Sequence, residues 1–303
     1  MGLIVRPCGP NELSSVLESM DREFVYSKGR SLSLSRRFPN IISQDYIEHI
    51  QVAEIDHSIC GSLTIRMFDF SVEKHIWRGA MIGMVLVNPR YRGHGVGKQM
   101  MAAAGRSLHD ERAEIGVLWT GIPEYYERMG WFLSDSSLLG ERIDLPASSS
   151  AKLSNSDALA CGPLVSMDIA RLERVRSELE TQFVIRMPID YQVLPLPATD
   201  VNCFWASTKE GEGYALVGEA DGIGYLYELV APPVIWGTLW AEVAGRHNRL
   251  LVNGQAGDPF CEWLTEKNYV KWQSQKKTMW FCVSPGIAKV PLETWHIPYF
   301  DRI

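Results

Sequence analysis

Apolar side chains follow two kinds of spacing over the first 134 residues. Four runs have the short spacing of β-strands: LIVRPC (3–8), YIEHIQVAEI (46–55), CGSLTIRMFDF (60–70) and WRGAMIGMVLV (77–87). We expect a strand at each run, with turns at 56–58 and 72–75. Between the first two runs, residues 9–24 have helical spacing, and Asn11 is the expected cap of that helix.

A second helix is expected directly after the glycine-rich stretch RYRGHGVGKQ (90–99). Its apolar stripe is formed by Val96, Met100, Ala104 and Leu108. The segments that follow predict a buried strand (114–121), a short helix (123–131) and a closing strand (131–137). Gly130 is expected to end the short helix in a left-handed conformation.

The second half repeats this order of elements. Residues 145–163 are rich in serine, alanine and proline without periodicity, which is typical of a linker. The later segments predict a helix (164–183), a hairpin turning at Asp221 and Gly222 (213–231), a helix (234–244), a strand (249–253), a helix (259–269) and a strand (275–283).

We therefore expect a domain over 1–145, a linker over 146–163 and a second domain over 164–303. A chain of 303 residues is long enough for two hydrophobic cores. The expected fold class is α/β (α+β), in which each domain is a mixed central sheet flanked by helices, and the repeated order suggests two copies of one fold.

Composition excludes several classes of protein. The formal net charge of -6, without any cluster of lysine and arginine, argues against nucleic acid as a partner. The histidines and the six cysteines are scattered without metal-ligand spacing, so we expect no metal and expect reduced, mostly buried thiols. No apolar run approaches the length of a membrane span, so the expected location is the cytoplasm.

The glycine-rich stretch lies between an expected strand and an expected helix, where main-chain N–H groups can bind an anion. A P-loop is excluded because Arg92 stands at its first glycine position and Gln99 at its Ser/Thr position. A dinucleotide fingerprint is a poor match, because counting from Gly93 places Lys98 at the third glycine. The remaining pattern is R-x-x-G-x-G, formed by Arg92, Gly95 and Gly97.

This pattern resembles motif A of the GNAT N-acetyltransferases, whose loop amides hold the diphosphate of coenzyme A. YYERMGW (125–131) resembles a second family motif, FYxxxGF. The resemblance covers roughly residues 3–134 and implies a GNAT fold with acetyl-CoA as the co-substrate. It assigns cofactor binding to Val85, Leu86, Val87, Arg92, Gly93, His94, Gly95, Val96, Gly97 and Lys98.

Catalysis by such a protein needs a proton donor for the departing thiolate and a base for the amine. By resemblance Tyr126 is the acid, and its neighbour Tyr125 is expected in the core. A family glutamate expected near Met81 is missing, because no carboxylate occurs between Arg78 and Val87. The base is left open among Glu54, Glu73, His75, Glu124, the terminal carboxylate of Ile303 and a water relay.

The second domain departs from the pattern where a cofactor would bind. VAPPVIWG (230–237) stands at the place of the glycine loop, and Pro232 and Pro233 remove two N–H donors. The domain therefore resembles a degenerate GNAT-like copy without cofactor. Seven of the ten tryptophans lie in this half and could line an acceptor pocket, although large apolar side chains more often build a core.

The expected activity is acetyl transfer from acetyl-CoA to a primary amine of a small molecule, such as an amino sugar or aminoglycoside. Two alternatives are a catalytically silent acyl-CoA-binding or scaffold module and a protein N-acetyltransferase. The chain as a whole resembles tandem-domain acetyltransferases. The expected partners are the amine and a possible second copy in a homodimer, with no nucleic acid and no membrane.

Overall fold

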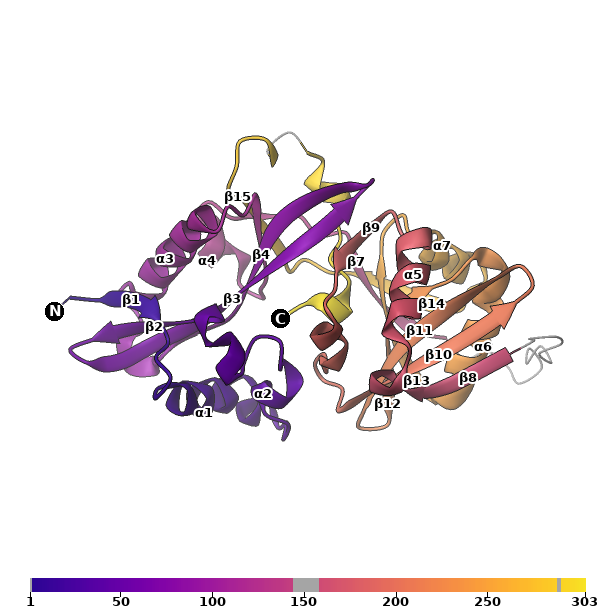
Figure 1. Ribbon diagram of the computed structural model, residues 1–303, viewed down its shortest axis with the longest axis horizontal. Helices are drawn as coiled ribbons and strands as arrows, with labels where there is room; N and C mark the ends of the chain where they lie inside the picture. The colour runs from indigo at the N-terminus through magenta and orange to yellow at the C-terminus, as the bar shows by residue number, and fades with distance from the viewer. Residues whose placement is uncertain (1, 144–157, 288–289) are drawn as a thin grey trace. The chain divides into compact units, whose positions relative to one another are not determined.

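The computed structural model describes residues 2–143, 158–287 and 290–303, which form two units (Figure 1). The first unit is Met1–Asp135, Lys276–Glu293 and Ile303, and the second is Ser136–Gln275 and Thr294–Arg302. This division differs from the expected domains at 1–145 and 164–303, because the chain returns to the first unit near its end. Most of the expected linker, residues 146–157, lies outside the described residues, whereas 158–163 form a strand.

The first unit contains a mixed sheet in the order β1-β2-β3-β4-β5-β15-β6. Its strands are β1 (Ile4–Pro7), β2 (Ile50–Ile55), β3 (Ser58–Val72), β4 (His75–Val87), β5 (Ile115–Trp119), β6 (Phe132–Leu133) and β15 (Thr278–Cys282). Its α-helices are α1 (Leu13–Phe24), α2 (Leu34–Arg37), α3 (Val96–Asp110) and α4 (Pro123–Glu127). Strands β1 to β4 pair antiparallel, and β4 pairs parallel with β5.

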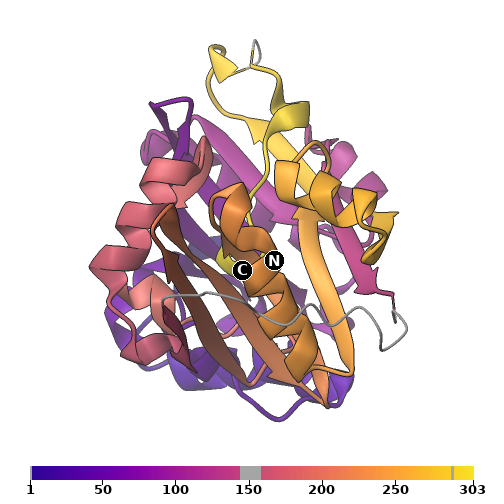
Figure 2. The same ribbon diagram turned by 90° about the vertical axis from the view of Figure 1, so that its right-hand side faces the viewer.

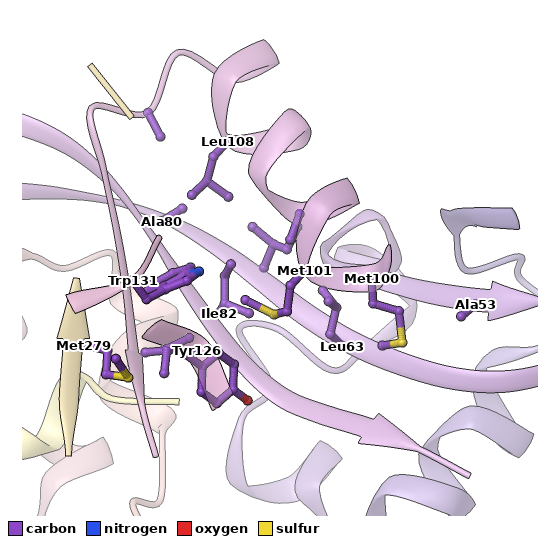
Figure 3. Close-up of a cluster of buried hydrophobic side chains, with 14 of the residues drawn as sticks. Ala53, Leu63, Ala80, Ile82, Met100, Met101, Leu108, Tyr126, Trp131 and Met279 are labelled. Atoms are coloured by element: carbon purple, nitrogen blue, oxygen red, sulfur yellow. The ribbon is translucent and has the colours of Figure 1, made fainter. Parts of the chain in front are cut away.

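Helix α3 covers one face of this sheet, and the core lies between them (Figure 3). The expected stripe of Val96, Met100, Ala104 and Leu108 is confirmed, since all four side chains are buried. They pack against alternate residues of the strands, such as Leu63, Ile65, Ala80 and Ile82. This packing fixes the start of α3 close to the end of β4.

The second unit has a sheet in the order β14-β7-β13-β12-β11-β10-β8. Its strands are β7 (Ser137–Arg142), β8 (Ala158–Pro163), β10 (Asp200–Thr208), β11 (Gly211–Ala220), β12 (Ile223–Val230), β13 (Arg249–Gln255) and β14 (Val270–Ser274). Strand β9 (Gln182–Ile185) lies in this unit but is not part of this sheet. The α-helices are α5 (Ile169–Leu179), α6 (Pro233–Arg246) and α7 (Pro259–Glu266). The hairpin turning at Asp221 and Gly222 is confirmed, with φ of 52° and 74° there.

Helices α5 and α6 cover opposite faces of this second sheet (Figure 2). Phe204 and Ala206 of β10 pack with α6, whereas the alternating Cys203 and Trp205 pack with α5. The two cores of the unit are therefore separated by the sheet. Trp205 and Trp240 are buried in them, which favours the expectation of core tryptophans.

Each sheet receives one strand from the other half of the sequence. Strand β15 follows the whole second sheet in the chain, yet it pairs between β5 and β6 of the first. Strand β7 precedes the second sheet's other strands and pairs between β13 and β14. The expected strand at 275–283 is thus confirmed, but it belongs to the first unit.

Several local expectations need correction. The N-cap of α1 is Glu12, not Asn11, and the Glu12 carboxylate accepts the Gly9 N–H at 2.7 Å. Residues 44–49 form a 3-10 helix, so β2 begins only at Ile50. The helix expected over 164–183 begins at Ile169, behind the N-cap Asp168. Strand β14 has no expected counterpart.

Candidate active site

Strand β4 contains a β-bulge that changes its pairing with both neighbours. Met84 and Val85 together oppose Leu63 of β3, and Met84 has a positive φ of 51°. On the other edge, the parallel pairing with β5 ends at Met81 and Val117, although β4 continues to Val87. The pairing of the two strands therefore ends at Met81, and among the described residues no strand pairs with β4 on that side near Val85, Leu86 and Val87.

The glycine loop follows immediately after this separated end. Gly93 and Gly95 are both left-handed, with φ of 82° and 78°, a conformation that favours glycine. The first hydrogen bond of α3 runs from the Gln99 N–H to the Gly95 carbonyl at 3.1 Å. Within the described residues, no acceptor is bonded to the main-chain N–H groups from Gly93 to Lys98. This arrangement of N–H donors at a helix start favours an anion, and the dipole of α3 acts in the same direction.

The side chains of this loop have different roles from its main chain. Arg92 donates from Nε to the Val87 carbonyl at 3.1 Å and lies 3.3 Å from the Glu23 carboxylate, so it ties the loop to β4 and α1. The His94 ring contacts the Arg92 carbonyl at 3.0 Å, and the Lys98 side chain is exposed. Val96 is buried, so only its N–H is available to a ligand.

The two tyrosines of α4 are arranged differently from the sequence-based expectation. Tyr125 is 38% exposed, which corrects its placement in the core, and it meets Tyr126 edge to face at 5.0 Å between ring centroids. Its hydroxyl oxygen lies so close to Gly97 that a Cβ on Gly97 would approach it to less than 3.0 Å. Gly97 is therefore required by the packing of Tyr125 on the first turn of α3.

Tyr126 is the buried member of the pair, with 8% of its surface exposed (Figure 3). Burial raises its pKa to about 12, and the neighbouring Tyr125 contributes in the same direction. Among the described residues, no hydrogen bond to its hydroxyl contributes to this pKa. Tyr126 consequently keeps its proton at neutral pH and has its donor available for a ligand.

Most of the candidate bases lie far from the bulge or are engaged elsewhere. Glu73 and His75 flank the β3–β4 turn, nine or more residues before Met84, which corresponds to about 30 Å along a strand. Glu54 forms an ion pair with Arg6 at 2.6 Å. Glu124 is exposed in the first turn of α4.

The terminal residue Ile303 is the candidate that the structure brings to β4. A Cβ placed on Gly83 would lie 3.3 Å from the main-chain carbonyl carbon of Ile303 and 3.0 Å from its Cγ1. Gly83 directly precedes the bulge at Met84, so Ile303 lies in the neighbourhood where the pairing of β4 with β5 has ended. The sequence carries no signal for this contact beyond the glycine itself.

The second unit repeats the separated strands but fills the space with its own groups. Parallel pairing of β12 with β13 ends at Leu226 and Val252, and the Asn253 side chain donates to the Leu226 carbonyl at 3.2 Å. At the start of α6, Pro233 has no N–H, and the Ile235 N–H bonds to the Pro232 carbonyl at 2.9 Å. A diphosphate would find few free donors here.

Comparison with known proteins places these features in a family. The description "Acetyltransferase (GNAT) domain" matches residues 5–133, which span β4, the glycine loop and both tyrosines. Residues 5–133 are a GNAT acetyltransferase domain. The family is one of acyltransferases, which supports acyl transfer as the general chemistry of this domain. A comparison with curated proteins returned no significant match.

Solved structures share the fold of both halves of this chain. A GCN5-related N-acetyltransferase from Anabaena variabilis is 15% identical with a TM-score of 0.73, covering 93% of this chain and 73% of that one. One from Kribbella flavida is 17% identical with a TM-score of 0.68, over 92% and 70%. A tandem GNAT protein from the clavulanic acid biosynthesis pathway is 12% identical with a TM-score of 0.59, over 94% and 99%. The GNAT fold in tandem is thus shown.

Two further findings concern metals and membranes. In the parts of the chain that the structure describes, no group of three or more His, Cys, Asp or Glu side chains is arranged to hold a metal ion. Over the same residues, every helix is too short or too polar to pass through a lipid bilayer.

Proposed function

We propose that this protein is an acetyl-CoA-dependent N-acetyltransferase that acts on a primary amine of a small molecule. Two observations carry the proposal: the pairing of β4 with β5 ends at Met81, and within the described residues the N–H groups between Gly93 and Lys98 have no acceptor. An open strand edge suits the amide-containing pantetheine arm, and a cluster of N–H groups at a helix start suits a diphosphate.

The proposed reaction joins the amine nitrogen to the acetyl carbonyl carbon and breaks the bond from that carbon to sulfur. The amine must lose a proton, and the departing thiolate must gain one. A general base or a water relay takes the amine proton, and the Tyr126 hydroxyl supplies a proton to the sulfur and regains one from solvent. Main-chain N–H groups of β4 near Val85 and Leu86 polarise the carbonyl.

The raised pKa of Tyr126 limits when its proton can move. A phenol with a pKa of about 12 would transfer its proton to a free thiolate with a pKa near 8.5 at a cost of about 5 kcal/mol. Complete transfer before the carbon–sulfur bond breaks is therefore unfavourable. Tyr126 acts by donating a hydrogen bond to the sulfur that strengthens as negative charge develops on it.

The acceptor class is supported by charge. With a formal net charge of -6, the chain attracts cationic amines more strongly than neutral or acidic ones. Polyamine-like and amino-sugar-like compounds, including aminoglycosides, are therefore the first acceptors to test.

Calorimetry and a turnover screen test the proposal in sequence. Coenzyme A and acetyl-CoA should bind to the full chain, and thiol release should follow when amines are added. Tyr126→Phe should lower kcat by about 10²- to 10⁴-fold with the affinity for acetyl-CoA unchanged, whereas Tyr26→Phe, on an exposed 3-10 helix, is the matched control. Equal turnover by both variants would remove the acid role from Tyr126. Binding without turnover of any amine, peptides included, would instead indicate a silent acyl-CoA-binding module.

A further inference from the structure

The second unit contains a cavity of about 400 Å³ on the face of its sheet that α6 covers. Its floor includes Phe204 of β10 and Val217 of β11, two buried side chains of the core beneath α6. Polar side chains from β8, β10, β11 and the end of α6 complete the lining: Cys161, Asn202, Glu219, Arg246 and His247. An apolar floor with a few polar groups, in a cavity of this volume, is typical of a small-molecule site.

Strand register places Glu219 and His247 at one end of this cavity. Glu219 of β11 is paired with Gly224 of β12, so the two residues point to the same face of the sheet. A Cβ on Gly224 would lie only 2.6 Å from Cγ of His247, so the imidazole ring packs directly on this glycine. Arg142 of β7 donates to the His247 carbonyl at 2.7 Å and fixes the backbone there. The Glu219 carboxylate and the His247 ring are therefore neighbours.

In the parts of the chain that the structure describes, the Glu219 carboxylate and the His247 Nε2 atom have no hydrogen-bond partner. Burial lowers the pKa of His247, although the charge of Glu219 acts in the opposite direction. The ring is therefore neutral at pH 7, and one of its nitrogens can accept a hydrogen bond. A buried polar atom without a partner is destabilising, and a donor in the adjoining cavity would satisfy it.

At the other end of the cavity, the charge of Arg246 is already neutralised. Arg246 donates from Nε to Glu242 at 2.7 Å, and its guanidinium carbon lies 5.2 Å from the ring centroid of Phe204. Phe204 is paired with Cys161 of β8, so the Cys161 thiol belongs to this end. Among the lining residues that the structure describes, Glu219 alone carries an unpaired charge.

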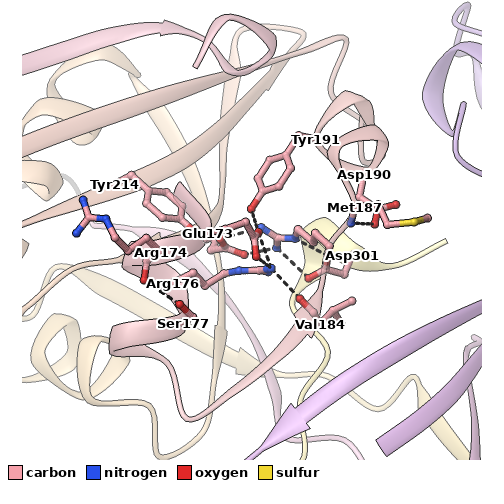
Figure 4. Close-up of polar contacts among 12 residues, drawn as sticks. Glu173, Arg174, Arg176, Ser177, Val184, Met187, Asp190, Tyr191, Tyr214 and Asp301 are labelled. Carbon is pink, nitrogen blue, oxygen red and sulfur yellow. Dashed lines mark hydrogen bonds and ion pairs between the residues drawn. The ribbon is translucent and has the colours of Figure 1, made fainter. Parts of the chain in front are cut away.

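On the opposite face of the same sheet, which α5 covers, buried carboxylates have their own cation (Figure 4). Arg186 donates from Nε to Asp301 at 2.7 Å and from Nη1 to Glu228 at 3.1 Å. The Tyr214 hydroxyl donates to Glu228 at 2.6 Å. The Glu219 carboxylate differs from these groups because it faces a cavity, where a cationic ligand can take the place of an arginine.

We propose that this cavity binds a small primary amine with an apolar chain or ring. A primary ammonium group has three N–H donors, and three acceptors lie toward one end of the cavity. They are the Glu219 carboxylate, the Asn202 side-chain oxygen and, after a small turn of the ring, the His247 Nε2. Asn202 is paired with Val217, so the apolar part of the ligand extends from there over Val217 and Phe204. The site lies wholly within the second unit and is independent of the acetyl transfer proposed for the first.

Protection of Cys161 from alkylation tests the proposal in the full-length protein. Of the six cysteines, Cys161 is exposed, Cys282 is partly exposed and four are buried, and mass spectrometry identifies which thiol has reacted. We expect 3-phenylpropylamine to slow the reaction of Cys161 with iodoacetamide. Two probes with the same apolar part should need at least about tenfold higher concentrations: 3-phenylpropanol, which lacks the charge, and the trimethylated ammonium, which lacks N–H donors.

Glu219→Gln should weaken the protection by 3-phenylpropylamine at least about tenfold, and Glu210→Gln is the matched control. Glu210 is exposed and lies nine residues before Glu219, which corresponds to about 30 Å along a strand. Both substitutions change the net charge equally and replace exposed side chains. Thermal melts check that both variants are folded, and calorimetry with 3-phenylpropylamine gives a second measure of its affinity.

Four results would overturn the proposal. Absence of protection by 3-phenylpropylamine at millimolar concentrations would remove the site. Equal protection by 3-phenylpropanol would indicate an apolar cavity without amine recognition, and equal protection by the trimethylated ammonium would remove the role of the three acceptors. Equal weakening by Glu219→Gln and Glu210→Gln would reduce the effect to the overall charge of the protein. None of these results depends on whether the protein transfers acetyl groups.

Discussion

The packing of Tyr125 on Gly97 predicts that Gly97→Ala destabilises the wild-type protein but not the Tyr125→Phe variant. In the wild type, Gly97→Ala would place a methyl group closer than 3.0 Å to the Tyr125 hydroxyl oxygen, which real Cβ atoms essentially never show. Overpacking of this kind costs about 1–3 kcal/mol. Alanine in place of glycine in a helix contributes up to about 1 kcal/mol in the opposite direction. The clash should dominate, and Gly97→Ala should destabilise the protein.

Removing the hydroxyl should reverse the result. In Tyr125→Phe, the nearest ring atom to the added methyl group is Cζ at 3.4 Å, which is ordinary van der Waals contact. Gly97→Ala in that background should therefore be neutral or stabilising by up to about 1 kcal/mol. The coupling between the two sites should amount to about 1–3 kcal/mol, within the range measured for residues in contact.

Urea unfolding of the four proteins and calorimetry with acetyl-CoA measure the effect. Gly97→Ala should also weaken acetyl-CoA binding, because the first turn of α3 must move to relieve the clash, and affinity should return in the double variant. Tyr125→Phe alone should bind acetyl-CoA as the wild type does. Equal destabilisation by Gly97→Ala in both backgrounds would refute the packing argument.

Two further predictions concern β4 and the second unit. Gly83→Ala brings a methyl group 3.0 Å from the Ile303 Cγ1, so Ile303 must shift, and we expect a lower melting temperature. Gly105→Ala, where nothing lies within 4 Å, is the control in the same thermal melts and should not lower it. Burial raises the pKa of Glu180 to about 8, and the negative charges of Glu228 and Asp258 raise it further. Between the ordinary carboxyl pKa and this value, Glu180 is protonated in the folded state and ionised in the unfolded state. The resulting stability is complete below about pH 4.3 and is lost as the pH rises through 8, by at most about 5 kcal/mol. Between pH 5 and 9 the melting temperature should therefore fall less steeply for Glu180→Gln than for the wild type. Parallel curves of melting temperature against pH would contradict this.

Local patterns predicted most elements of the fold because they depend on nearby residues. The stripe of α3 and the turn at Asp221 and Gly222 follow from side-chain periodicity and from the need for positive φ. The prediction of Asn11 as the N-cap of α1 was wrong. Asn11 and its neighbour Glu12 can both begin this helix, and Glu12 is held in place because its carboxylate also pairs with Arg6. Tertiary contacts of this kind override a local preference.

The candidate site likewise has residues that the sequence predicts and residues that it does not. The glycine loop and Tyr126 lie in short motifs, so a resemblance can assign them from sequence. The bulge at Met84, the contact of Tyr125 with Gly97 and the contact of Ile303 with Gly83 join residues that are distant in sequence or depend on side-chain direction. Only a glycine at positions 83 and 97 hints that another group approaches there.

The exchange of strands explains why the domain boundary could not be read from composition. Alternating apolar residues in β15 predict a strand but do not name its partner, because pairing is set by long-range register. A chain cut within 144–157 would leave β5 and β6 without the strand that pairs between them, and would leave β13 and β14 without β7. Unpaired edges of this kind favour aggregation. Each sheet is therefore complete only when the chain contributes a strand from both sides of residues 144–157.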